Sequence, residues 1–434
     1  MTSFFAPPPG ARYALRGLNA LLPDGTLAKR DLVIENGAIA DVAAAGAVPA
    51  DLGPDLKGAM AWPCPADVHT HLDKGHIWPR SPNPDGSFFG ALTATMADRR
   101  ARWTPADVEA RFDFAVRTAY ARGVAAIRTH LDSFPPQAEI SWPVFAKLRD
   151  KWAGKVTLQA SSIVAMDLFA DDEGRKLADL VAKHGGQLGC VTRMSGEDHA
   201  GVPEGFDELM EKVFVLAEER GLDLDLHVDE TDDPSARTLI RIARIALKRG
   251  FKGKILAGHC CSLAVQEDEA IAETVKLCAD SGIAVVSLPM CNMYLQGRAP
   301  GRTPRWRGVT TLHEMRAAGM KVAVGGDNVR DPFYAYGDHD MVETFVQAVR
   351  ILHLDHPLGD WALSATATPA AIMGLGKSGR IEKGAPADLI VFKARNWSEF
   401  LSRNQADRTV IRRGAAIDTT APDFAELDGL MAGA

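Results

Sequence analysis

Short apolar runs alternate with amphipathic stretches through the middle of the chain. Between the runs, apolar residues recur at every third or fourth position, which predicts helices over segments such as 107–121, 205–220, 235–249 and 266–281. The apolar runs themselves predict eight strands, at 60–68, 124–129, 155–163, 188–193, 222–228, 254–258, 283–288 and 321–326. Eight strands that alternate with helices are typical of an α/β fold of the TIM type, a (β/α)₈ barrel.

The two ends of the chain follow a different pattern. Both alternate apolar and polar residues, as in "RDLVIENGAIADVA" near the start and "GRIEKGAPADLIVFKA" near the end, with Asn-Gly or Asp-Gly turn signals in the first part. We therefore expect a small β-sandwich formed by both chain ends, residues 1–58 and 377–434. The catalytic (β/α)₈ barrel would occupy residues 59–376.

Composition narrows the range of functions. The chain has 434 residues, of which 46% are hydrophobic and 24% charged, as in ordinary globular proteins. The net charge is −7 and no Lys/Arg cluster occurs, so a nucleic acid is not an expected partner. No apolar stretch reaches the roughly 18 residues that cross a bilayer, and no signal peptide is recognisable. We expect a cytoplasmic protein that does not associate with membranes, and the sequence is compatible with a homo-oligomer.

Histidines and an aspartate stand where the predicted strands end. His69 and His71 end the first strand and, being two residues apart, project to the same side. His227, His259 and Asp327 end the fifth, sixth and eighth strands. One such histidine alone would be an ordinary buried side chain, but the carboxyl ends of barrel strands form the active face. Together they predict a site for a divalent ion such as Zn²⁺ or Fe²⁺.

Two nearby residues refine this site. The fourth strand ends in "CVTRMSG", where Arg193 stands and no lysine is available to bridge a second ion, which predicts one ion per chain. Glu230 follows His227 by three residues and could carry a proton between water and a leaving nitrogen. The alternative for Glu230 is a solvated acid in the charged run "DETDD".

Five motifs resemble the amidohydrolase superfamily, in particular its cytosine deaminase-like branch. They are "VHTHLDK", "HVDE", "AGHCCSL", "LPMCNMYLQGR" and "GGDNVRDPF", and the resemblance extends over about residues 60–375. It implies the hydrolytic deamination of a small amino-substituted heterocycle, in which water adds to the carbon that bears the amino group and ammonia leaves. It also implies one bound metal ion, with the ligands His69, His71, His227 and Asp327.

The resemblance implies further roles near the metal. Glu230 would transfer protons, His259 would orient and polarise the attacking hydroxide, and Asp327 would contribute to catalysis as well as to metal binding. Gln296, in the "LQGR" motif, would face the substrate. Asn328 and Met166 are also expected to contact the substrate. Asn328 replaces the second aspartate that cytosine-specific members carry, and Met166 lies in the loop where those members carry a glutamine.

Because of these two differences, the sequence does not identify the heterocyclic ring of the substrate. A cytosine-like aminopyrimidine or a related ring is the expected small-molecule partner. A hydrolase of a cyclic amide or of an N-substituted triazine, with the same metal site, is the alternative, and a non-catalytic base-binding barrel is a third reading. His130, Asp73, Lys74 and Trp306 are polar or aromatic residues near these motifs to which the sequence assigns no role.

Overall fold

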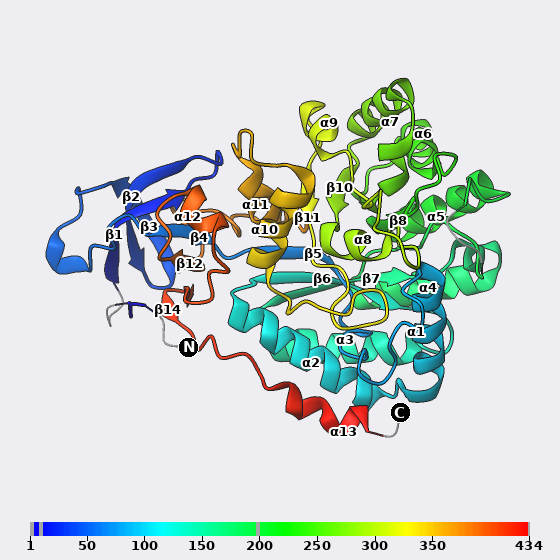
Figure 1. Ribbon diagram of the computed structural model, residues 1–434, viewed down its shortest axis with the longest axis horizontal. Helices are drawn as coiled ribbons and strands as arrows, with labels where there is room; N and C mark the ends of the chain where they lie inside the picture. Colours follow the sequence, from blue (N-terminus) through cyan, green and yellow to red (C-terminus); the bar gives the residue numbers. More distant parts are fainter. Residues whose placement is uncertain (1–3, 8–11, 197–199, 433–434) are drawn as a thin grey trace.

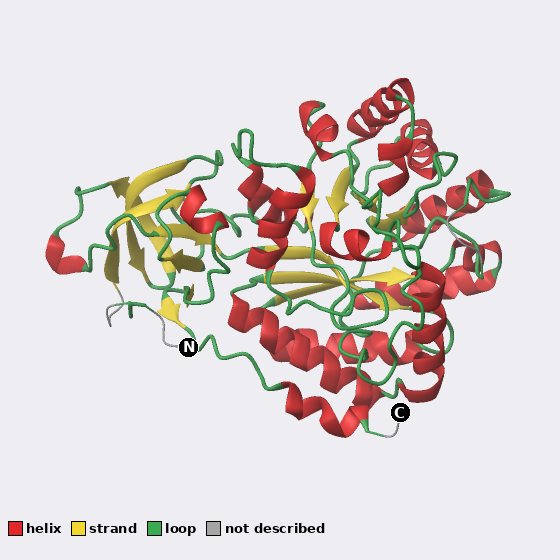
Figure 2. Cartoon of the chain, viewed as in Figure 1, coloured by secondary structure: helices red, strands yellow, loops and turns green. Residues whose placement is uncertain are grey.

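The computed structural model describes residues 4–7, 12–196 and 200–432. Its centre contains parallel strands surrounded by helices, the arrangement of a TIM-barrel-like α/β fold (Figures 1 and 2). One parallel sheet has the order β5-β6-β7, with β5 Ala66–Thr70, β6 Ala126–Asp132 and β7 Thr157–Ile163. The second has the order β11-β10-β9-β8, with β8 Leu224–Val228, β9 Ile255–His259, β10 Ala284–Ser287 and β11 Val322–Val324.

Isolated β-bridges connect the two parallel sheets. On one side Thr70 bridges to Asp327, and on the other the segment 187–191 bridges to β7 and to β8. The predicted strand 188–193 is therefore not a regular strand within the described residues. At its centre the Ser162 hydroxyl both donates to the oxygen and accepts from the amide of Gly189, at 2.9 Å each. A side chain thus takes the place of ladder hydrogen bonds, and the prediction of eight regular strands is confirmed only as a TIM-like arrangement.

Helices follow the strands along the chain. The segments predicted as helical correspond to α2, α5, α6 and α7. Helix α6 begins three residues later than predicted, because the buried Asp229 carboxylate accepts hydrogen bonds from the amides of Thr238 and Leu239. The helices are α1 Phe88–Arg102, α2 Pro105–Arg122, α3 Ala138–Trp152, α4 Asp172–His184, α5 Phe206–Arg220, α6 Thr238–Arg249, α7 Asp268–Ser281, α8 Pro289–Leu295, α9 Leu312–Ala317, α10 Met341–Leu352, α11 Ala367–Ile372, α12 Trp397–Leu401 and α13 Asp428–Met431.

The two chain ends share one sheet. Its order is β14-β13-β12-β4-β1-β2-β3, and its strands are β1 Arg12–Leu21, β2 Leu27–Glu35, β3 Ala38–Ala44, β4 Met60–Pro63, β12 Leu389–Phe392, β13 Thr409–Arg412 and β14 Ala415–Ala416. Strand β4 pairs with β1 on one side and with β12 on the other, so the ends meet edge to edge. The expected sandwich of two sheets is not confirmed. The predicted strand 60–68 divides into β4 and β5, near Pro65, which has no amide hydrogen to donate.

Aromatic packing connects this sheet to the barrel. The fully buried Trp62 of β4 stacks on Phe400 at 4.8 Å between ring centroids and contacts Phe345 of α10 edge-on at 5.2 Å. Beyond β14 the chain runs along α2 to α13 (Figure 1), where Glu426 pairs with Arg117 at 2.7 Å. None of the helices within the described ranges combines the length and the hydropathy that a bilayer crossing requires.

Candidate active site

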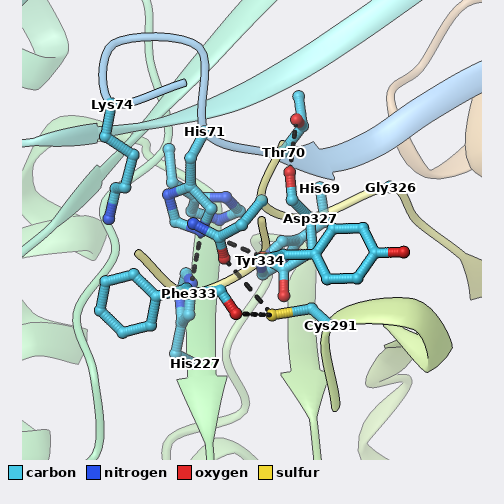
Figure 3. A network of polar contacts seen from close by, with 12 residues as sticks. His69, Thr70, His71, Lys74, His227, Cys291, Gly326, Asp327, Phe333 and Tyr334 are labelled. Carbon is cyan, nitrogen blue, oxygen red and sulfur yellow. Dashed lines mark hydrogen bonds and ion pairs between the residues drawn. The ribbon is translucent and has the colours of Figure 1, made fainter. Parts of the chain in front are cut away.

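The carboxyl ends of β5, β8, β9 and β11 bring the strand-end histidines and Asp327 together (Figure 3). The Oδ1 atom of Asp327 lies 3.2 Å from Nε2 of His71 and 3.6 Å from Nε2 of His69. The Nε2 atoms of His71 and His227 are 3.3 Å apart. All four side chains are buried, so the segments that the sequence places far apart converge on one small volume.

The chemistry of these donors fits a divalent ion. Burial, together with the neighbouring imidazoles, holds the pKa values of His69, His71 and His227 well below the usual range, and Lys74 contributes to the shifts of His69 and His71. These imidazoles are therefore neutral donors. Burial raises the pKa of Asp327 to about 7, although the nearby thiol of Cys291 opposes this shift. Among the described residues, no hydrogen bond of ordinary geometry reaches either oxygen of this carboxyl group. Unpartnered buried oxygens and nitrogens this close together are what a cation would satisfy. Among the described residues, two overlapping groups have a geometry that could hold a metal ion: His69, His71, His130 and His227, and His69, His259 and Asp327.

The local backbone is shaped for this convergence. His259 and Asp327 both have positive φ angles, of 66° and 59°, which turn the chain sharply as it leaves the strand. Beside them, a Cβ atom on Gly258 would lie only 2.7 Å from Cε1 of His69. Glycine at this position is therefore required for the His69 ring to lie against β9.

Glu230 and His259 lie next to these ligand candidates. Burial and the nearby Asp327 carboxylate raise the pKa of Glu230 well above its ordinary value. Oε1 of Glu230 is 3.4 Å from Nδ1 of His259, and the amide nitrogen of Asn292 donates to both, at 3.4 and 3.0 Å. Because Nδ1 accepts this hydrogen bond, the proton of the neutral His259 ring resides on Nε2, and burial lowers the pKa of this ring to about 3. His259 is therefore a neutral donor with a fixed tautomer.

A cavity of about 730 Å³ opens above these residues. Its lower wall contains His71, His227, Glu230, His259 and Asp327. Its upper wall is largely apolar and comes from α1 and from the segments after β6 and β7, namely Phe88, Leu92, Met96, Trp103, Phe134, Ile140, Ile163, Val164 and Ala165. The volume and the mixed lining are those of a small-molecule site.

The predicted substrate contacts occupy different positions. Asn328 lines the cavity, and its amide nitrogen donates to Asp331 at 2.7 Å. Gln296 does not line the cavity; it donates to the backbone oxygen of Glu230 at 3.2 Å and thereby supports the loop that carries this acid. Met166 is also absent from the cavity wall, because its amide donates to Arg193 O and its side chain is fully buried in the main core. The three residues before Met166 form the wall instead.

The residues to which the sequence assigned no role lie at different distances from the cavity. His130 lies beneath the ligand cluster, with Nε2 3.0 Å from Oδ1 of Asp225 and its ring centroid 4.0 Å from that of His69. Asp73 accepts from the amide of Asp132 at 2.8 Å. Trp306 is half-buried and does not line the cavity.

Lys74, Asp132 and Arg193 do line the cavity. Asp132 was not singled out from the sequence, although it follows His130 by two residues and therefore projects from the same side of β6.

Comparisons with known proteins identify the family to which this chain belongs. The amidohydrolase family profile matches residues 145–417. The chain is 52% identical to a pterin deaminase of Rhizobium rhizogenes over 99% of both chains. It is 24% identical to an N-isopropylammelide isopropyl amidohydrolase of a Pseudomonas species, over 84% of this chain and 87% of the relative. Among solved structures, a 5-methylcytosine deaminase from Klebsiella pneumoniae with 5-fluorocytosine bound superposes with a TM-score of 0.82 at 25% identity, covering 93% of this chain and 97% of the other. The predicted resemblance to amidohydrolases is confirmed.

Proposed function

This chain belongs to the amidohydrolase family, and from that premise we propose that it is a metal-dependent deaminase of a pterin-like ring, a fused heterocycle with an amino group on a carbon between two ring nitrogens. The observation that carries the proposal is the contact between Glu230 and His259 at the floor of the cavity, beside a cluster of neutral imidazoles and a carboxylate. The 52% identity to a pterin deaminase supports this ring class over cytosine.

The metal-binding role falls to His69, His71, His227 and Asp327, which would hold one divalent ion, Zn²⁺ or Fe²⁺. An ion of this kind lowers the pKa of water, so that a nucleophile is available near neutral pH. Arg193 supports a single ion, since it ends the segment 188–193, where a second ion would need a bridging lysine.

The reaction moves both protons of one water molecule. Glu230 would take the first proton as the water oxygen adds to the carbon that bears the amino group, and this proton goes to the ring nitrogen whose C=N bond opens. The second proton leaves the new hydroxyl group and reaches the departing nitrogen through Glu230, so that the C–N bond breaks, a C=O bond forms and ammonia leaves. Burial and the nearby Asp327 carboxylate raise the pKa of Glu230 well above its ordinary value, so its protonated form is a more available proton donor than that of an exposed glutamate.

His259 would stabilise the same step. Its Nε2–H is the available donor of the ring, since Nδ1 accepts from Asn292. A neutral donor directed at the adding oxygen stabilises negative charge there without drawing away the proton that Glu230 needs.

A screen for ammonia release tests the proposal. Purified protein loaded with Zn²⁺ or Fe²⁺ would be given pterin, cytosine, isocytosine, creatinine and an aminotriazine, with Glu230→Gln as the inactive control. We expect pterin to give the highest kcat/KM. Release of an alkylamine from an N-alkyl triazine in preference to ammonia from pterin would favour the N-substituted triazine alternative. Binding of pterin without release of ammonia would favour a base-binding protein.

A further inference from the structure

Lys74 is a buried cation on the cavity wall that the reaction described above does not use. It follows His71 by three residues, is 5% exposed and lines the same cavity as Glu230 and His259. In Figure 3 its side chain extends beside His71 on the side of the site where Phe333 lies, and its Nζ atom is 5.3 Å from the centroid of the Phe333 ring. A cation is expensive to bury, so its environment should explain it.

An ion pair with Asp132 keeps Lys74 in its charged form. Nζ lies 3.0 Å from Oδ1 of Asp132, whose other oxygen accepts from Arg99 at 2.9 Å. Burial alone would lower the pKa of Lys74, but the carboxylates of Asp132 and Asp73 outweigh it and raise that pKa. Lys74 is therefore an ammonium group at neutral pH, fixed in position by a carboxylate that has a second cation to pair with.

An ammonium group has three N–H donors and no acceptor. The ion pair with Asp132 is the one that the described residues provide for it, and the adjacent Phe333 ring offers only its π face. A ligand group that contacts Lys74 must therefore be an acceptor. Among amino-heterocycles, the strongest acceptor is a ring carbonyl oxygen, which also takes up negative charge when a nucleophile adds to a carbon conjugated with it.

We propose that Lys74 is a substrate-binding residue that donates a hydrogen bond to a ring carbonyl oxygen, so that the enzyme selects 2-amino-4-oxo rings over 2-amino rings without the carbonyl. Asp132 is the positioning residue for Lys74. The inference rests on the proposed function, because it concerns the same cavity and the same class of ring.

The test compares two substrates that differ by the carbonyl group. Wild-type protein and Lys74→Met would be assayed with pterin, which is 2-amino-4-oxopteridine, and with 2-aminopteridine. Methionine keeps an unbranched side chain as far as Cε and lacks only the terminal ammonium group, and Arg99 should still pair with Asp132 in this variant. We expect Lys74→Met to lose about 10²-fold in kcat/KM for pterin and less than about threefold for 2-aminopteridine. Asp132→Asn should show a smaller loss with the same selectivity.

Two controls separate binding from folding. Lys276→Met replaces an exposed lysine on α7 and should leave both substrates unaffected. Metal content and melting temperature should be the same in wild type and Lys74→Met. An equal loss for both substrates, or no loss for pterin, would overturn the inference.

A binding measurement keeps this inference separate from the proposed function. In the metal-loaded Glu230→Gln protein, pterin binding can be followed by the quenching of its own fluorescence. If wild type releases no ammonia from any ring, the proposed function fails. The Lys74 inference then stands or falls on whether Glu230→Gln/Lys74→Met binds pterin about 10²-fold more weakly than Glu230→Gln does.

Discussion

Single side chains determine whether this site is chemically competent. Glu230, His259 and Asn292 form a compact group in which one amide orients both the acid and the imidazole. If the side-chain amide of Asn292 moved, the tautomer of His259 would no longer be fixed and Glu230 would no longer be held in position. The rate should therefore respond to these residues far more than the stability does.

Glu230→Gln is the direct test of the proton transfer. Glutamine is isosteric and can still accept from Asn292, so the fold and the metal site should persist. Without a titratable group the departing nitrogen leaves unprotonated, and we expect kcat to fall by about 10³-fold or more. Metal analysis, a melting curve and steady-state kinetics check the three parts. A kcat within about tenfold of wild type would assign the proton to another group.

Gly258 offers a test of the metal site that does not touch any ligand. A methyl group at this position would overlap the His69 ring, so Gly258→Ala should displace His69 and weaken metal binding by about 10–100-fold. Competition with a chelator measures this affinity. Gly429→Ala, where a Cβ atom would meet open space, is the matched control. Equal affinities for the two variants would show that His69 is not a ligand.

The sequence predicts which site residues lie close together better than it predicts which residues contact the substrate. His69, His71, His227, His259 and Asp327 stand at strand ends, and parallel strands necessarily bring their ends to one edge. Which neighbouring side chains face the cavity depends on loops whose paths are set by tertiary hydrogen bonds. Met166 illustrates this: its backbone contact with Arg193 turns the side chain into the core.

At the scale of elements, the apolar run 60–68 predicts one strand, but the structure has two separate strands in this part of the chain. The first is the strand that joins the two chain ends, and the second is the barrel strand that leads to His69 and His71. Periodicity could not separate them, because both parts are buried and a proline between strands leaves the apolar pattern intact. The segment 188–193 was similarly predicted as a strand from its composition, although its hydrogen bonds to β7 are partly made by a serine hydroxyl.

Trp62 on β4 should stabilise the contact between sheet and barrel without affecting the reaction. Its ring packs against Phe345, Phe392 and Phe400, and truncating a buried tryptophan typically costs about 3–5 kcal/mol. We expect Trp62→Ala to lower the melting temperature by several degrees and to leave kcat at low temperature nearly unchanged. Phe89→Ala, at a side chain that is 52% exposed, should leave the melting temperature unchanged. A melting temperature of Trp62→Ala equal to that of wild type would contradict this role.

The whole molecule should depend on its metal for stability as well as for activity. Without an ion, neither oxygen of the buried Asp327 carboxyl and neither ring nitrogen of His69 has a hydrogen bond of ordinary geometry among the described residues. An ion that binds the folded chain more tightly than the unfolded chain raises the melting temperature, and the increase grows with the logarithm of the free ion concentration relative to its dissociation constant. Treatment with a chelator should therefore lower the melting temperature, and about one equivalent of Zn²⁺ or Fe²⁺ per chain should restore it. A requirement for two equivalents would contradict a mononuclear site.

The pairing of β4 with β12 also has a consequence for biosynthesis. Met60 of β4 pairs with Phe392 of β12, so β4 is synthesised early and remains without this partner until near the end of translation. At about 5–20 residues per second a ribosome needs roughly 20–70 s to make the intervening stretch. During that time the β1–β3 meander emerges with β4 as an open edge, while the barrel strands are produced and can associate. The nascent chain therefore exposes an unpaired strand edge while the barrel is synthesised, and this edge is where a ribosome-associated chaperone would be needed.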